Sequence, residues 1–200
     1  HAMSGADIAL WDLKGKIEGK PVSELLGGRV RDDVRAYASV LFADTPEETA
    51  EMAKEYVAMG LTAVKFGWGP IGPDPDVDVA HVAAAREAVG WDRDLMVDAG
   101  HAWDWETALG RTELFKPYKI AWLEEPVGQD DRKGYAELCK RSEIPIAGGE
   151  GDVTHWDFED LIERGLDIVQ PDIAFCGGIT VCKRVSDMTT AHGRKAVPHC

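Results

Sequence analysis

Ionisable side chains recur at the ends of short apolar runs along this 200-residue sequence. From residue 98 onward they follow one another at intervals of 26, 26, 22 and 27 residues, about the length of one strand and one helix. A single carboxylate after an apolar strand is usually the cap of the next helix. Several in phase indicate a shared site, because the carboxyl ends of parallel barrel strands converge on one face. The residues in this series are Lys65, Asp98, Glu124, Glu150, Asp172 and His199.

Three members of the series, Asp98, Glu124 and Glu150, are carboxylates that would repel one another if they met without a cation. A hard divalent metal relieves that repulsion and leaves coordination positions open for substrate oxygens. The pattern therefore predicts a metal site, with Mg²⁺ as the first choice.

Seven short apolar runs are the candidate strands that position these residues: 34–42, 62–67, 95–100, 120–126, 144–150, 167–172 and 195–200. Helical patterns separate them, near 46–60, 76–90, 104–115, 131–141, 155–164 and 179–192. The first of these helices has the clearest boundaries. Thr45 is its predicted N-cap, Pro46 its first residue, Glu48 the partner in a capping box and Gly60 its end.

Strands that each precede an amphipathic helix are typical of a parallel α/β sheet. Seven consecutive units favour a (β/α) barrel, and an open doubly wound sheet is the alternative. No G-x-G-x-x-G motif follows the first strand, and the GGRV at 27–30 precedes a strand instead of opening a helix, which makes a dinucleotide-binding fold a weak interpretation.

The composition excludes several classes of protein. With 44% hydrophobic residues the chain can bury a core, and its formal charge of −14 argues against a nucleic-acid partner. No apolar run is long enough to span a membrane, so we expect no membrane span. The first residues lack the basic flank and the continuous apolar stretch of a signal peptide. The cysteines, Cys139, Cys176, Cys182 and Cys200, form no metal or disulfide pattern, so we expect reduced thiols in a cytoplasmic protein.

Both ends of the sequence resemble interior segments of a longer enzyme. The first residues already have a helical pattern without a cap, and the last run, KAVPHC, stops where a loop is expected. A complete barrel needs about 250 residues. We therefore expect a barrel fragment.

The segments VDAG, WLEEP, GGE, QPD-x4-GGIT and VPH occur in an order and spacing that resemble the mandelate racemase subgroup of the enolase superfamily. The opening SGADIALWDLKGKIEGKPVSELLGG is similar to the segment that joins this family's capping domain to its barrel. The resemblance implies a TIM-type modified (β/α)7β barrel, here without the N-terminal capping domain and the last strand. Residues 1–33 would be the linker helix, and 34–200 would form strands 1–7 of the barrel.

The resemblance also implies roles for the residues. Asp98, Glu124 and Glu150 would hold Mg²⁺, and Lys65 would hold the carboxylate of the substrate. His199 would be the base that removes the proton α to that carboxylate to give an enediolate, and Asp172 would orient it. The simpler interpretation of His199 is a histidine satisfied by a neighbour at a strand end, but its phase with Asp172 favours catalysis.

Other candidates lie in the same loops. His101 is a candidate proton donor or sugar-binding residue, although a plain loop histidine is the more common case. Glu125 has a supporting role or none, and Trp68 is a candidate pocket wall or an ordinary packing residue.

The second strand departs from the family pattern. Relatives of mandelate racemase carry Lys-x-Lys there, whereas this chain has Lys65-Phe66-Gly67. Glycine therefore stands at the position of the second base, which two-sided proton exchange requires. Elimination of a β-hydroxyl needs a single base that can also act as the acid, and His199 is suited to both tasks.

These features predict Mg²⁺-dependent dehydration of an acid sugar, such as an aldonate, to a 2-keto-3-deoxy acid. A racemase, epimerase or cycloisomerase of the same family is the alternative, as is an inactive metal-binding fragment. The expected partner is a small carboxylate, with no nucleic acid or membrane, and we expect a homo-oligomer at full length.

Overall fold

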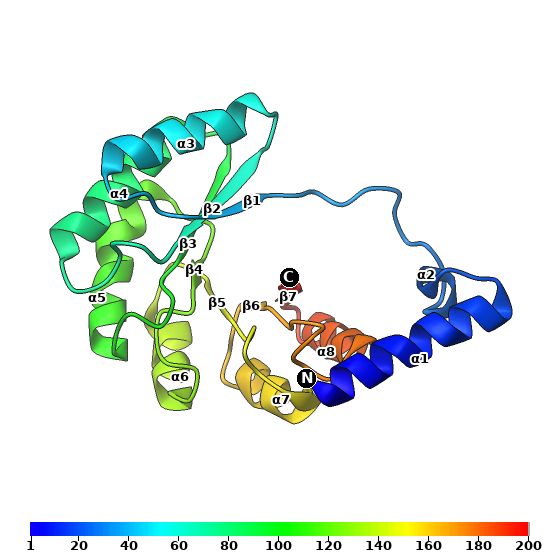
Figure 1. Cartoon of the computed structure of the whole chain (residues 1–200). Coiled ribbons are helices and arrows are strands. Elements are labelled where there is room, and N and C mark those ends of the chain that lie inside the picture. The colour runs from blue at the N-terminus through cyan, green and yellow to red at the C-terminus, as the bar shows by residue number, and fades with distance from the viewer. Residues whose placement is uncertain (200) are drawn as a thin grey trace. The chain divides into compact units, whose positions relative to one another are not determined.

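The computed structural model describes residues 1–199, which form two compact units. Unit 1 comprises residues 1–35, 149–162 and 169–199, and unit 2 comprises 36–148 and 163–168. Figure 1 traces both along the chain, by colour from the N-terminus to the C-terminus. The assignment of 1–33 as a linker and 34–200 as a barrel remains a prediction.

Unit 2 is a parallel sheet whose strands alternate with helices. Its interior consists of strand residues such as Phe66, Leu95 and Leu123, and of helix residues such as Val82 and Phe115, all fully buried. Its elements are β1 (Ala38–Leu41), α3 (Pro46–Ala58), β2 (Ala63–Gly67), α4 (Pro75–Val89), β3 (Asp94–Asp98), α5 (Trp105–Phe115), the 3-10 turn η1 (Lys116–Tyr118), β4 (Leu123–Glu124), α6 (Arg132–Arg141) and β5 (Ile146–Gly148).

Unit 1 contains the N-terminal helices and the last helices of the chain. They are α1 (Ala2–Glu18), α2 (Val22–Leu25), α7 (Thr154–Glu163, whose last residue belongs to unit 2) and α8 (Ile179–Ala191). The strand β7 (Lys195–Ala196) follows α8. The two residues of β6 (Ile168–Val169) fall on either side of the division between the units.

The strand order is β1-β2-β3-β4-β5-β6-β7, the same as the order in the sequence. This order confirms the predicted alternation of seven parallel strands and helices. It also decides between the two predicted architectures, because a doubly wound sheet reverses its strand order at a switch point whereas a barrel adds each strand beside the last.

The later strands are shorter than the apolar runs that predicted them. The run 120–126 gives only β4, since Glu125 adopts a left-handed φ of 41° and Pro126 has no N–H to donate. The run 144–150 ends at Gly148, before Gly149 with φ 107°. In the run 195–200 only Lys195 and Ala196 are strand, and Cys200 lies outside the described residues.

The helix α3 begins as its sequence predicts. The Thr45 hydroxyl accepts a hydrogen bond from the Glu48 N–H at 3.2 Å, and the Glu48 carboxylate accepts one from the Thr45 N–H at 3.2 Å. Pro46 is the first helical residue, and Gly60, with φ 88°, follows the last turn. The capping box therefore satisfies two backbone donors that would otherwise lack partners.

Thr45→Ala should lower the free energy of unfolding by about 1 kcal/mol, because it removes the side-chain acceptor of this cap. Thr190→Ala is the matched control, since the Thr190 hydroxyl donates to the Ser186 carbonyl of its own helix, at an exposed position. Urea denaturation of both variants measures the difference. Equal stability of the two variants would contradict the assigned cap.

Two other findings bear on the class of protein. Within residues 1–199, no helix is long and apolar enough to cross a membrane. In the same range, no disulfide joins Cys139, Cys176 or Cys182.

Candidate active site at the strand ends

Three of the predicted site residues meet in unit 2. Lys65 lies on β2, and Asp98 and Glu124 are the last residues of β3 and β4, where they are paired in parallel register. The Lys65 ammonium donates a hydrogen bond to Glu124 Oε1 and lies 3.7 Å from Asp98 Oδ2. All three side chains are buried, so the lysine and the two carboxylates form one charged cluster inside the protein.

The cluster shifts the pKa values of its members. Burial and the neighbouring charge of Glu124 raise the pKa of Asp98 to about 6, against the opposing effects of Lys65 and the Gly100 N–H. Burial alone would lower the pKa of Lys65, but the charges of Glu124 and Asp98 and the hydrogen bond to Glu124 raise it above its ordinary value. One cation therefore does not fully compensate two buried carboxylates.

Each carboxylate is also held by a fixed donor. The Trp122 indole N–H donates to Glu124 Oε2 at 2.9 Å, and the Gly100 N–H donates to Asp98 Oδ1 at 2.9 Å. Sequence reasoning did not identify Trp122 as part of the site. The signal was available, because a residue two positions before Glu124 points to the same face of the strand.

Gly67, at the position of the second lysine in the family pattern, is closely packed. A Cβ placed there would lie 2.7 Å from Asp98 Cβ and 3.1 Å from Asp98 Oδ2. Any side chain at this position would have to displace Asp98. Gly67 therefore leaves the space that the Asp98 carboxylate occupies. It also stands where relatives carry the second lysine, so this position provides no base.

His101 and Glu125 form a second pair in unit 2. His101 Nε2 lies 3.1 Å from Glu125 Oε2, and Nδ1 lies 2.9 Å from the Val127 carbonyl oxygen. Glu125 is buried, whereas about a third of the His101 side chain is exposed. Both residues have a left-handed backbone, with φ 64° and 41°, which is typical of strained positions at functional sites.

Trp68 also has a left-handed backbone, with φ 56°, and is 52% exposed. Its ring lies over the backbone of Gly100, where a Cβ would approach within 3.0 Å. Substrate-binding roles for Trp68, His101 and Glu125 remain predictions.

The predicted catalytic pair lies in unit 1. His199 Nδ1 is 2.8 Å from Asp172 Oδ2, and the two residues form an isolated parallel bridge next to β6 and β7. On the other side of the ring, His199 Nε2 is 3.3 Å from Glu150 Oε2. In the tautomer with the proton on Nδ1, that N–H donates to Asp172, and the lone pair that could act as a base lies on Nε2, beside Glu150.

The donor set fits a hard divalent cation, because Asp98 and Glu124 offer buried carboxylate oxygens with an excess of negative charge and Glu150 adds a partly exposed carboxylate. Asp98 and Glu124 are neighbours in unit 2, whereas Glu150 belongs to unit 1. No group of three or more potential metal ligands meets within the part of the chain that the structure describes. That Asp98, Glu124 and Glu150 bind one metal ion therefore remains a prediction. The structure brings two of them, Asp98 and Glu124, together.

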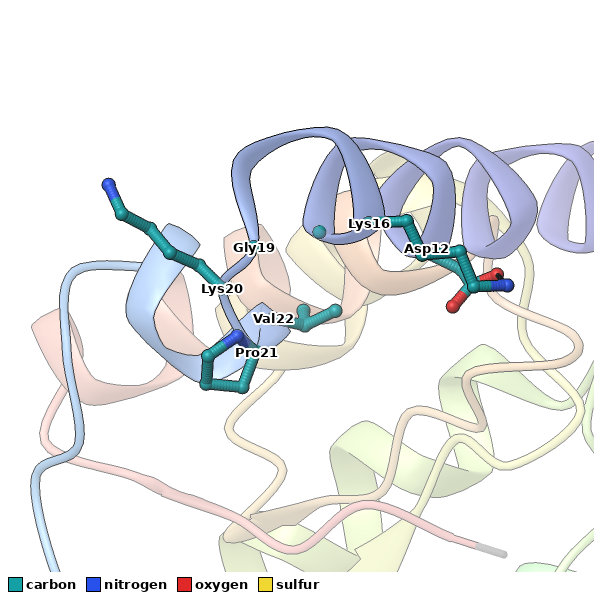
Figure 2. Close-up of a pocket in the computed structure, with 7 residues that line it drawn as sticks. Asp12, Lys16, Gly19, Lys20, Pro21 and Val22 are labelled. Carbon is teal, nitrogen blue, oxygen red and sulfur yellow. Dashed lines mark hydrogen bonds and ion pairs between the residues drawn. The ribbon is translucent and has the colours of Figure 1, made fainter.

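A surface hollow of about 260 Å³ lies at the turn between α1 and α2 (Figure 2). It contains none of the predicted site residues. Its lining residues are Asp12, Gly15, Lys16, Gly19, Lys20, Pro21 and Val22.

Comparison with known proteins identifies the family. Residues 48–200 match the model described as "Enolase C-terminal domain-like". Residues 1–27 match the N-terminal domain of mandelate racemase / muconate lactonizing enzyme.

Two characterised relatives match the whole chain. The D-galactarolactone cycloisomerase of Agrobacterium fabrum is 39% identical over 205 residues, which cover 99% of this chain and 53% of that protein. The L-talarate/galactarate dehydratase of Salmonella typhimurium is 37% identical over 204 residues, which cover 100% of this chain and 50% of that protein. The chain thus spans about half the length of these relatives.

A solved structure of a mandelate racemase/muconate lactonizing protein from Paracoccus denitrificans, complexed with magnesium, has the same fold. It is 34% identical, covers 98% of this chain and 55% of its own, and superimposes with a TM-score of 0.91. The chain therefore belongs to the mandelate racemase/muconate lactonizing enzyme family of the enolase superfamily, with that family's TIM-type α/β barrel as its fold class.

Proposed function

We propose that this chain carries the barrel chemistry of a Mg²⁺-dependent dehydratase that converts an acid sugar to a 2-keto-3-deoxy acid and water. The observation that carries the proposal is the His199–Asp172 pair together with glycine at position 67. The chain thus offers one histidine base and no lysine at the position of a second base. One base is sufficient for elimination, whereas racemisation requires a second base, which glycine at position 67 does not provide.

His199 would remove the proton α to the substrate carboxylate through Nε2, while Asp172 accepts a hydrogen bond from Nδ1–H and stabilises the imidazolium that forms. The imidazolium then returns a proton to the departing β-hydroxyl, which leaves as water. The resulting enol rearranges to the 2-keto acid. The proton taken from carbon is balanced by the proton given to oxygen.

Asp98, Glu124 and Glu150 would hold Mg²⁺, and the cation when bound would supply fixed positive charge to stabilise the enediolate form of the substrate. Lys65 would hold the substrate carboxylate. Its ammonium already lies at the two buried carboxylates of unit 2, and Trp122 fixes the orientation of Glu124.

Cycloisomerisation is the second candidate, because the cycloisomerase of A. fabrum is as similar to this chain as the dehydratase is. Both reactions begin with removal of a proton α to a carboxyl group. They differ in the fate of the enediolate, which in dehydration expels a β-hydroxyl group as water. In cycloisomerisation a ring bond is broken or formed instead, and no water is lost.

Incubation of the intact protein with Mg²⁺ and a panel of aldonates, aldarates and their lactones in D₂O tests the proposal. We expect one acid sugar to release a 2-keto acid, detected as its semicarbazone. Conversion without loss of water, seen as an isomer of the same composition or as deuterium at the α-carbon of recovered substrate, would instead favour the second candidate. Absence of both signals across the panel would contradict proton abstraction altogether.

A further inference from the structure

The first helix of the chain reaches the loop that follows β6. The Ser4 hydroxyl accepts a hydrogen bond from the Gly177 N–H at 3.1 Å. Three residues further along α1, the Asp7 carboxylate accepts two hydrogen bonds from Thr180, one from its N–H at 3.0 Å and one from its hydroxyl at 2.6 Å. Residues about 170 positions apart in the sequence are thereby joined, and Figure 1 shows α1 and α8 next to each other within unit 1.

Asp7 performs the task of an N-cap for α8. The residue before that helix is Gly178, which has no side chain to cap the free N–H groups of the first turn. A Cβ at Gly178 would lie 2.4 Å from Asp7 Oδ2, so the glycine makes room for the carboxylate. A negative charge at this end also interacts favourably with the helix dipole.

Thr180 gains a further partner from the same helix. The Trp11 indole N–H donates to the Thr180 hydroxyl at 2.8 Å, while that hydroxyl donates to Asp7. The hydroxyl hydrogen is therefore directed by two groups of α1. This arrangement fixes the start of α8 against α1 more firmly than a single cap bond would.

The capped loop is the one that carries Asp172. Asp172 Oδ1 accepts a hydrogen bond from the Ala174 N–H at 2.6 Å, and the Asp172 carbonyl oxygen accepts one from the Cys176 N–H at 2.7 Å. Gly177, the partner of Ser4, follows directly. The other carboxylate oxygen, Oδ2, is the one that faces His199. A shift of the loop would thus move the oxygen that orients the base.

We propose that Ser4 and Asp7 are positioning residues for the Asp172–His199 pair, so that α1 holds the catalytic carboxylate in place through the loop between β6 and α8. The kinetic part of this inference rests on the proposed function. The structural part does not, because the hydrogen bond between His199 and Asp172 exists whether or not a particular sugar acid is the substrate.

The main test is Asp7→Ala in the intact protein, with Asp12→Ala as the matched control. Asp12 lies on the same helix, forms an ion pair with Lys16 at an exposed position, and is labelled in Figure 2. With the acid sugar found active in the panel, we expect Asp7→Ala to lower kcat roughly tenfold or more, because small displacements of catalytic groups have large effects. KM should change less than about twofold, and Asp12→Ala should leave both constants unchanged.

A double-mutant cycle separates the cap from other effects of the substitution. Thr180→Val removes the hydroxyl that Asp7 and Trp11 hold. If the cap acts as one unit, the kcat of Asp7→Ala/Thr180→Val should be close to that of Asp7→Ala alone instead of the product of both losses. Asp7→Asn, which keeps one oxygen acceptor for the Thr180 N–H, should recover part of the lost kcat.

The spectroscopic readout is the His199 Nδ1 proton in ¹⁵N-histidine-labelled protein without substrate. We expect its resonance to shift or broaden in Asp7→Ala, whereas the resonance in Asp12→Ala should match the unchanged protein. Faster amide exchange at Thr180 with an unchanged His199 resonance and unchanged kcat would overturn the inference, since α1 would then only stabilise α8. If no acid sugar reacts, the proposed function fails, and the resonance still decides the structural part. If Asp7→Ala does not fold, Asp7→Asn and Thr180→Val give the same comparison.

Discussion

His199→Asn should lower the rate of deuterium exchange at the substrate α-carbon by about a thousandfold. A positioned general base contributes roughly 10²–10⁴ to such a reaction, and asparagine cannot accept the proton at neutral pH. His199 Nε2 also lies 3.3 Å from Glu150 Oε2, so the substitution changes the surroundings of one proposed metal ligand. We therefore expect the affinity for Mg²⁺ to change, but by less than about tenfold.

Exchange measured by NMR in D₂O, with Mg²⁺ affinity measured by calorimetry, gives both quantities. His192→Asn is the control, because His192 is an exposed histidine at the end of α8 whose ring bonds to the Met188 carbonyl. Asp172→Asn should be equally or less severe than His199→Asn, since it acts through the histidine. Full exchange activity in His199→Asn would assign the base to another residue, with Lys65 and His101 the next candidates.

Asp98→Asn should weaken Mg²⁺ binding at least tenfold and, in the absence of metal, stabilise the protein at pH 7. Both effects come from the buried charge of Asp98, whose pKa is raised to about 6, first by burial and then by Glu124. A carboxyl with a raised pKa stabilises the folded state in its protonated form. Its contribution is therefore full below pH about 4 and is lost as the pH rises through about 6.

At pH 7 the neutral asparagine should therefore raise the free energy of unfolding by up to about 3 kcal/mol. Each unit by which the pKa of Asp98 is raised corresponds to roughly 1.4 kcal/mol. The unchanged protein should also lose Mg²⁺ affinity below pH 6, because a proton then competes with the metal for Asp98. Urea denaturation with chelator and calorimetry between pH 5 and 8 measure the two effects. Asp92→Asn, at a largely exposed carboxylate, should change neither.

Glu124→Gln and Glu150→Gln should also weaken Mg²⁺ binding if all three carboxylates are ligands. Unchanged affinity in the three variants would refute the metal site. Increased affinity in Asp98→Asn together with unchanged stability at pH 7 would refute the electrostatic explanation as well.

Local sequence patterns are enough to predict the order of the strands and helices and the positions of the ionisable residues along them. Apolar runs followed by helical patterns predict the seven parallel strands, because backbone hydrogen bonding and burial of one helix face act locally. The capping box of Thr45 and Glu48 is such a local signal, and it is present as predicted. The apolar runs predict longer strands than β4 and β5, because the positive φ angles of Glu125 and Gly149 end these strands early. Those backbone conformations depend on neighbouring segments.

Which charged side chains contact one another, and which groups form hydrogen bonds to them, depends on the tertiary structure. Lys65 on β2 binds Glu124 on β4, which is two strands away in the sheet. Gly67 must be small because it is paired with Asp98 on the neighbouring strand. The cap of α8 by Asp7 is the clearest case, because its donor and acceptor are 173 residues apart. Hydrogen bonds and electrostatic interactions depend on distance in space, and a linear pattern gives the identities of the partners but not that distance.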